Sequence, residues 1–146
     1  MARAPAGFSL VELVLVLVLI GILAVFVVPR INIGGFDSGA FRDEMVAAFR
    51  HAQRLAMASG CPIQVSVSGG EYNVAWTGDG GSACQPAGPV AHPSRGGALS
   101  GSGPATSEGQ VVFDGMGRVE SGLAIGLEDG RQVIVEGGSG HVRTGS

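Results

Sequence analysis

One carboxylate, Glu12, stands at the start of an apolar run that extends from Leu13 to Val28. Burying an acid in hydrocarbon costs roughly 2.5–3.5 kcal/mol on insertion scales, and ionisable groups in such segments are usually paired and functional. We therefore expect Glu12 to have a cationic partner. Arg3 is a nearby positive charge. Cleavage after Gly7 would supply another, on the same subunit or on a neighbour, because the new amine of Phe8 would lie four residues before Glu12, on the same helix face.

The segment around this acid is long enough to cross a membrane. From Phe8 to Val28 only Ser9 and Glu12 are polar, and a helix of this length, at about 1.5 Å per residue, spans roughly 30 Å. The alternatives are a secretory signal peptide and a plain membrane anchor. The run is too long for a typical signal peptide and no small-x-small cleavage site follows it, whereas a plain anchor would have no use for Glu12.

Two cysteines, Cys61 and Cys84, are the whole thiol inventory of the chain. By the positive-inside rule, we expect Arg3 and the other residues before the apolar run to stay in the cytoplasm, so the bulk of the chain lies across the membrane. An even cysteine count in an oxidising compartment favours a disulfide, and we predict Cys61–Cys84. Two buried free thiols are the alternative. The scattered histidines add no metal-ligand spacing, and we predict neither a metal site nor a cofactor.

Other reactive side chains lie in a stretch without periodicity between Thr77 and Gly109, which carries Asp79, His92 and Ser94. A long loop of this kind is either functional or disordered. One aspartate does not make a calcium loop. The chain also lacks a nucleophile elbow, a metal-binding helix and a phosphate-binding loop. We therefore predict that the protein is not an enzyme.

The amino-terminal residues resemble the class III signal of type IV pilins and of type II secretion pseudopilins. The resemblance rests on Gly7-Phe8-Ser9-Leu10-Val11-Glu12, with Gly21 and Pro29 downstream. It implies that a prepilin peptidase cuts between Gly7 and Phe8 and methylates the new Phe8 amine. It also implies that Glu12 pairs with the terminal amine of an adjacent subunit during assembly on an inner-membrane platform, and that Gly21 and Pro29 kink the helix.

The composition allows one small domain behind one membrane helix. The chain has 146 residues, 26 glycines and a net charge of -3. Removing residues 1–7 takes away Arg3 and leaves eight arginines against twelve acids, or -4. This balance argues against a general polyanion binder. We predict a leader at 1–7, a transmembrane and assembly helix at 8–29, and a periplasmic head at 30–146.

The residue patterns of the head indicate an α+β domain. Pro29 removes a helical hydrogen bond, so the first helix should break or kink there. Asp37 is expected to cap a second helix, with Phe36 and Phe41 as a hydrophobic staple, and Gly60 to end it. Its apolar face, which should pack on a sheet, comprises Phe41, Met45, Ala48, Phe49, Ala52, Leu55, Ala56 and Ser59.

Strand patterns follow this helix. Residues 63–67 and 72–76 alternate across Ser68-Gly69-Gly70, which predicts a hairpin. Residues 111–113, 123–127 and 132–135, separated by glycine-containing turns, predict an antiparallel meander. The expected architecture is a long amino-terminal helix packed on an antiparallel sheet.

This order resembles one branch of the family, the minor pseudopilins and minor pilins of the GspH and FimT type. The similarity lies in the helix entry at Phe36-Asp37, the helix end at residues 54–58 and the segment 112–118. Residues 61–65 and 90–97 are similar to minor subunits of the mannose-sensitive haemagglutinin pilus. The resemblance implies a minor subunit at or near the tip of a pilus or secretion pseudopilus, which helps to initiate assembly.

The alternative function is a pilus-borne receptor for DNA or another external ligand. Some relatives of the FimT type have a basic carboxyl tail. Here the tail, residues 140–146, has Arg143 and the mostly neutral His141. Electrostatic DNA binding grows with the number of phosphates neutralised, so the sequence makes nucleic-acid binding unlikely to be the main role. A surface contact of the His92–Arg95 segment with a partner remains open.

Overall fold

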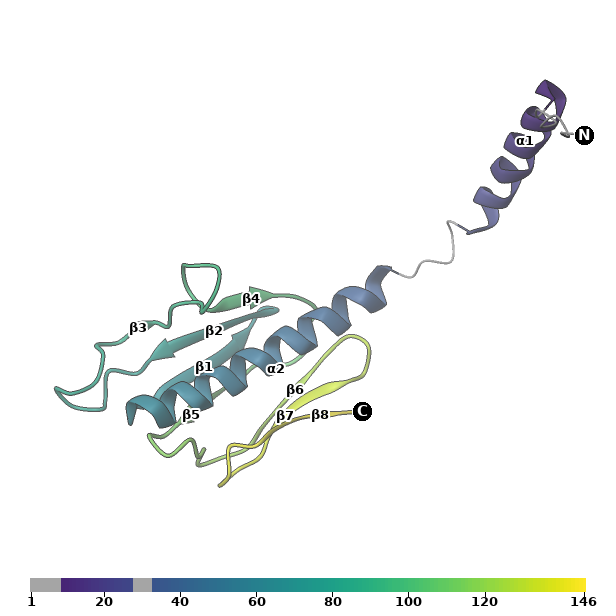
Figure 1. Ribbon diagram of the computed structural model, residues 1–146. Coiled ribbons are helices and arrows are strands. Elements are labelled where there is room, and N and C mark those ends of the chain that lie inside the picture. Colours follow the sequence, from purple (N-terminus) through teal and green to yellow (C-terminus); the bar gives the residue numbers. More distant parts are fainter. Residues whose placement is uncertain (1–8, 28–32) are drawn as a thin grey trace, which may run out of the picture. The chain divides into compact units, whose positions relative to one another are not determined.

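A computed structural model of the chain describes residues 9–27 and 33–146. The chain divides into two compact units, one ending at Ile33 and one running from Gly34 to Ser146 (Figure 1). The predicted boundary between residues 29 and 30, and the expected break at Pro29, lie outside the described residues. The first unit contributes helix α1, Leu10–Val27. This helix continues through Gly21, and a kink at that residue stays a prediction.

Helix α2 spans Ile33–Ser59. It begins before Asp37, so the prediction that Asp37 caps it is wrong. Gly34 and Gly35 each disfavour helix by about 1 kcal/mol relative to alanine, but the stability of helices in proteins comes mainly from packing of an amphipathic face, which outweighs such local costs. The carboxyl end is as predicted. Gly60 has φ +70°, and its amide donates to the carbonyl oxygen of Ala56 at 2.8 Å.

The predicted hairpin is confirmed as β1, Ile63–Ser68, and β2, Glu71–Trp76, paired antiparallel with Ser68 opposite Glu71. Gly69 and Gly70 form the connection with φ +57° and +77°. A two-residue turn with positive φ at both positions matches the twist of the strands, and glycine adopts it without steric cost.

The rest of the first sheet comes from segments far apart in the sequence. Strand β5, Gly109–Phe113, pairs antiparallel with the other edge of β1. On the far side of β2 lie two short strands, β3 at Gly88–Pro89 and β4 at Ser100–Ser102. The stretch between Thr77 and Gly109 is thus partly ordered as sheet, contrary to the expectation of a loop without regular structure.

The predicted meander is confirmed for the antiparallel pairing of residues 123–127 with 132–135, and is wrong for residues 111–113. Strands β6, Leu123–Gly126, β7, Gln132–Val135, and β8, Val142–Gly145, form a second, three-stranded antiparallel sheet. Its order along the sheet is β6, β7, β8, and β5 belongs to the other sheet. A long link from Asp114 to Gly122 separates β5 from β6. A tight turn would have required these two strands to pair, but a link of this length does not.

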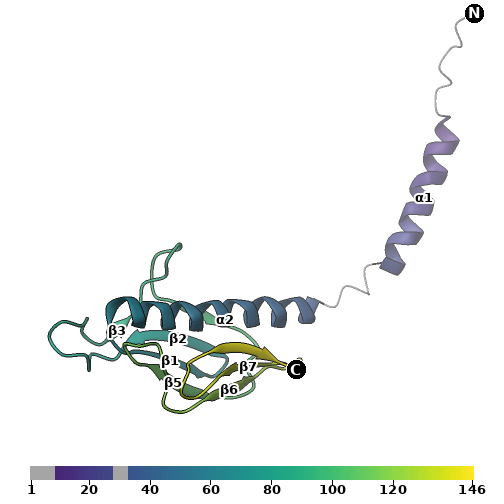
Figure 2. The same ribbon diagram turned by 60° about the horizontal axis from the view of Figure 1, so that its bottom comes forward.

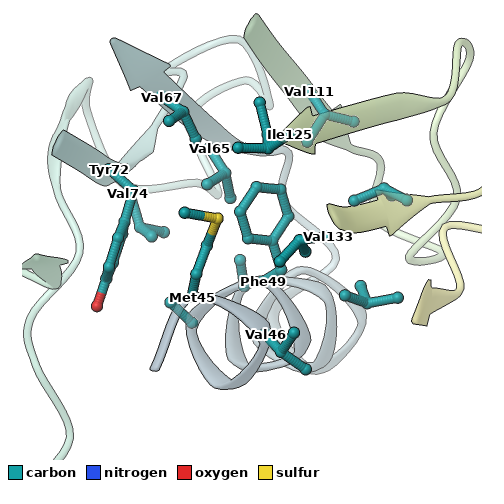
Figure 3. Close-up of a cluster of buried hydrophobic side chains, with 14 of the residues drawn as sticks. Met45, Val46, Phe49, Val65, Val67, Tyr72, Val74, Val111, Ile125 and Val133 are labelled. Atoms are coloured by element: carbon teal, nitrogen blue, oxygen red, sulfur yellow. The ribbon is translucent and has the colours of Figure 1, made fainter. Parts of the chain in front are cut away.

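Helix α2 lies against the strands of the head in both views (Figures 1 and 2). The hydrophobic core comprises buried residues of α2 and of both sheets. Figure 3 shows Met45 and Phe49 of α2 pointing toward Val65 and Ile125, one from each sheet. The fully buried large side chains include Tyr72, Phe49, Phe113, Met45 and Ile63. The predicted apolar face of α2 is therefore confirmed for its central residues.

Two details of that face differ from the prediction. Val46 is also buried, because α2 packs against a second sheet and so needs a wider apolar stripe. Ser59 is exposed. Its hydroxyl donates to the carbonyl oxygen of Leu55 at 2.8 Å and accepts from the amide of Cys61 at 3.2 Å. Ser59 therefore stabilises the end of the helix instead of packing in the core.

Candidate functional site: the amino-terminal helix and the surface of the head

Glu12 lies in the first turn of α1. Its backbone amide donates to both the carbonyl oxygen and the hydroxyl of Ser9, at 3.1 and 3.2 Å. Ser9 is thus the amino-terminal cap, and Glu12 is the third helical residue. A negative charge in the first turn also interacts favourably with the helix dipole. The Ser-x-x-Glu spacing could have indicated this role of Ser9 from the sequence.

Apart from Glu12, the side chains described on α1 are apolar in every direction. Their exposed fractions range from 44% at Val16 to 79% at Leu10, so the helix presents no polar face on which it could rest in water. A helix that is hydrophobic all round is normally covered by protein or lipid. In the part of the chain that the structure describes, no helix meets the combined length and hydropathy required of a membrane span. Gly7, Phe8 and Pro29 lie outside the described residues.

The disulfide between Cys61 and Cys84 is present, with Cα atoms 5.6 Å apart. It joins the start of β1 to the segment that follows β2. A Cβ atom on Gly80 would overlap the side chain of Cys84, so this segment turns tightly around the bond. The disulfide therefore encloses the first hairpin, as predicted.

The second part of this segment forms a small hairpin beside β2. Val90 donates to the carbonyl oxygen of Val74 at 2.9 Å, and the amide of Val74 donates to Leu99 at 3.0 Å. At its tip the His92 Nδ1 atom accepts from the backbone amides of Ser94 and Arg95, at 3.2 and 3.0 Å. The ring of His92 therefore organises the turn through these two backbone contacts.

These contacts do not assemble a catalytic group. The Ser94 hydroxyl lies 3.5 Å from His92 Nδ1, which two backbone donors already occupy. Within residues 33–146, no hydrogen bond joins Asp79 to either side chain; its amide instead donates to the Thr77 hydroxyl at 3.2 Å. The arrangement supports a folded turn, and it provides no activated nucleophile.

A small pocket of about 240 Å³ lies between this hairpin and α2. Tyr72 lines it from β2, Glu44 and His51 line it from α2, and Arg95 lies 3.6 Å from the Glu44 carboxylate. The Tyr72 side chain is fully buried, and its hydroxyl has no hydrogen-bond partner of normal geometry among the described residues. Burial, together with a smaller effect of the nearby Glu44, raises the pKa of Tyr72 to about 12, and Arg95 opposes this shift.

The turn after β5 is organised by Asp114. Its carboxylate accepts from the amides of Met116 and Arg118, at 2.9 and 2.8 Å. The backbone hydrogen bond from Arg118 is the main cause that holds the pKa of Asp114 below its usual value. The role of Asp114 is structural, because these bonds direct the chain away from β5.

The carboxyl tail forms β8 rather than a free arm. Arg143 pairs with Glu136 at 2.8 Å, which neutralises the one arginine that the tail offers for DNA. A different basic group lies nearby on α2. Arg50, Gln53 and Arg54 line a pocket of about 390 Å³ together with His141 and Val142.

Two family profiles match the chain, and a solved structure aligns with it. Residues 42–142 match the profile of the family described as type II transport protein GspH. Residues 3–28 match the prokaryotic N-terminal methylation motif. The crystal structure of the type IV minor pilin FimU from Pseudomonas aeruginosa aligns with a TM-score of 0.48 and 16% identity, covering 75% of this chain and 88% of that one. No curated protein matches the sequence significantly.

An apolar helix that begins with a methylation motif and leads into an α+β head defines a type IV pilin-like subunit, which is a structural component of a filament. The family match covers most of the head. The chain belongs to the GspH family. The predicted resemblance to minor pilins and pseudopilins of this type is thereby confirmed, and the motif implies processing by a prepilin peptidase, anchoring through the amino-terminal segment and assembly with other pilin subunits.

Proposed function

We propose that the protein is a minor subunit at or near the tip of a type IV pilus or a type II secretion pseudopilus, where it helps to initiate assembly. The observation that carries this proposal is α1, whose described side chains are apolar on all sides apart from Glu12. Such a helix has to be covered, and neighbouring helices of the same kind in a filament core would cover it. Before assembly the inner membrane would do so, with residues 8–29 as the span and the head in the periplasm.

The mechanism follows from the position of Glu12. A prepilin peptidase cuts between Gly7 and Phe8 and methylates the Phe8 amine. Glu12 then pairs with the terminal amine of an adjacent subunit on the inner-membrane platform. This pair compensates the cost of a carboxylate in an apolar environment, which is otherwise several kcal/mol. Gly21 and Pro29 would let the helix bend as it leaves the membrane.

The position of the disulfide in the head supports assignment as a minor rather than a major subunit. The disulfide closes the segment around the first hairpin, whereas in the major pilins that this family resembles the bond usually lies near the carboxyl end. The competing proposal, a receptor for DNA, is less well supported because Arg143 of the tail is paired with Glu136.

The replacement of Glu12 by alanine tests the pairing mechanism. The Glu12→Ala variant should enter the membrane normally, since its helix becomes more apolar, but should be missing from sheared filaments. Immunoblots of membrane and filament fractions would measure both. Normal incorporation of this variant would refute the pairing. A bulky residue at Gly7 should instead leave the leader attached, which mass spectrometry would detect as seven extra residues.

Initiation and tip position require a separate measurement. Deleting the gene should lower the number of filaments per cell without shortening those that form, because a nucleating subunit acts once per filament. Immunogold labelling of the head should mark filament ends. Labelling along the whole filament, together with shortened filaments in the deletion strain, would indicate a subunit of the shaft instead.

A further inference from the structure

The arginines of the head differ in their partners. Arg50 and Arg54 have no carboxylate within ion-pair distance in the described part of the chain, although both are exposed. The other described arginines are each paired, as Arg42–Asp43, Arg95–Glu44, Arg118–Asp114, Arg131–Asp129 and Arg143–Glu136. The unpaired positive charge of the described head is therefore concentrated on one side of α2.

Intramolecular contacts hold both side chains in place. Arg50 Nη2 donates to the carbonyl oxygen of Val142 in β8 at 3.1 Å. Arg54 Nε donates to the carbonyl oxygen of Arg50 at 3.2 Å. Each contact uses one of the five donors of a guanidinium, so most donors of both groups are free for a ligand.

The floor of the same pocket is fixed as well. Gln53 Nε2 donates to the carbonyl oxygens of Gly117 and Ser139, at 2.8 and 3.3 Å. These bonds tie the carboxyl-terminal part of α2 to the turn after β5 and to the turn before β8. Because the flanking groups are already ordered, a ligand would bind here with little loss of side-chain entropy.

The pocket is suited to an anion. Its lining residues are Arg50, Gln53, Arg54, His141 and Val142, with no carboxylate among them. Guanidinium groups bind carboxylates and phosphates through paired N–H donors. Binding along a nucleic acid needs several neutralised phosphates, and this chain of net charge -3 offers two free arginines here. A single carboxylate fits the pocket better than a polyanion does.

We propose that this pocket receives a carboxylate side chain of a neighbouring filament subunit. The inference rests on the proposed function, which places other subunits around the head. The contact would fix the rotation of the head relative to its neighbour, since paired guanidinium–carboxylate bonds are directional. It is separate from the Glu12 pairing, which involves the amino-terminal helix.

Photo-crosslinking of the full chain in its native host tests the proposal. A photoreactive phenylalanine analogue at His141 lies at the pocket, and the same analogue at the exposed Glu128 is the control. Crosslinks from position 141 should join another pilin-like subunit at a peptide containing Asp or Glu. Arg54→Glu should lower their yield roughly tenfold, whereas Arg131→Glu should not. Mutating the mapped acid to arginine should also abolish the crosslink, and combining it with Arg54→Glu should restore it.

Arg54→Gln removes the charge without introducing an acid. Its melting temperature should match that of the unmodified chain, so that a lower crosslink yield in this variant reports lost binding and not lost folding. An unchanged crosslink in Arg54→Glu, or a mapped contact without an acid, would overturn the inference. So would binding of double-stranded DNA or anionic vesicles that depends on Arg54 without a subunit crosslink. If the chain is found in sheared filaments but gives no crosslink at 141, the pocket inference fails alone; absence from filaments would refute the proposed function and this inference with it.

Discussion

The backbone amide of Glu12 donates to the hydroxyl of Ser9 at 3.2 Å, so helix capping at the start of α1 depends on the Ser9 side chain and on the Glu12 backbone. The Glu12 carboxylate is not needed for that bond. Capping and subunit pairing can therefore be separated by mutation, although the two residues are only three positions apart.

Ser9→Ala should weaken the first turn of α1 by about 0.5–2 kcal/mol, because the amide of Glu12 loses its side-chain acceptor. It should leave the carboxylate in place, so filament incorporation should persist. Helix content in detergent and immunoblots of sheared filaments would measure the two effects. Ser9→Asp, which retains a capping oxygen, is the matched control for the helix content. A loss of incorporation in Ser9→Ala as complete as in Glu12→Ala would mean that capping, and not the charge, controls assembly.

Removal of the disulfide should lower the stability of the head. Replacing Cys61 and Cys84 together by serine should reduce the free energy of unfolding by roughly 3 kcal/mol, because the unfolded chain is no longer cross-linked. Denaturant unfolding of the detergent-solubilised chain would measure this. The reduced wild-type chain is the control and should unfold like the double variant. Equal stability of the oxidised, reduced and double-variant chains would contradict the expectation.

The Tyr72 phenol should make the head sensitive to high pH. Its pKa is raised from 10.0 to about 12, so the unfolded chain loses the phenolic proton first. The stability contribution is complete below pH 10, the ordinary value, and is lost as the pH rises toward 12. Tyr72 is the one tyrosine in the sequence, so tyrosinate absorbance reports this residue directly. Titration at the ordinary value in the folded protein would refute the prediction.

Tyr72→Phe should change stability at neutral pH by less than about 1 kcal/mol, or increase it, because the hydroxyl that it removes makes no hydrogen bond of normal geometry. The loss of stability at high pH should become smaller in this variant. Thermal unfolding at pH values on either side of the Tyr72 pKa would test both statements. A large destabilisation at neutral pH would show that the hydroxyl has a bound partner in solution.

Packing of α2 on the sheets should dominate the stability of the head. Phe49 is fully buried between them, and Phe49→Ala should lower the free energy of unfolding by about 3–5 kcal/mol. Met116, which is 64% exposed, is the control, and Met116→Ala should cost less than about 0.5 kcal/mol. Chemical denaturation of both variants would give the difference. Similar values for the two would indicate that α2 is not packed in solution as described.

Much of the fold was predictable because its causes are local. The alternation on either side of Gly69-Gly70 predicted β1 and β2, and the spacing of Phe41, Met45 and Phe49 predicted the buried face of α2. The amino-terminal motif predicted the family. The start of α2 was missed because packing of the whole helix outweighs the local preferences of Gly34 and Gly35.

The sequence by itself thus determined the class of protein. The motif that indicates this class, a carboxylate at a fixed distance from Gly7 at the start of an apolar helix, is local and can be recognised without knowledge of the tertiary structure. Only the tertiary structure decided the pairing of β5 with β1, the separate sheet that ends in β8, and the neighbours of each charge. Strand partners and ion pairs join residues far apart in the chain, and periodicity carries no information about which of them meet. For this reason the sequence showed nine arginines, whereas the fold distinguished Arg50 and Arg54 from the other described arginines, which are paired.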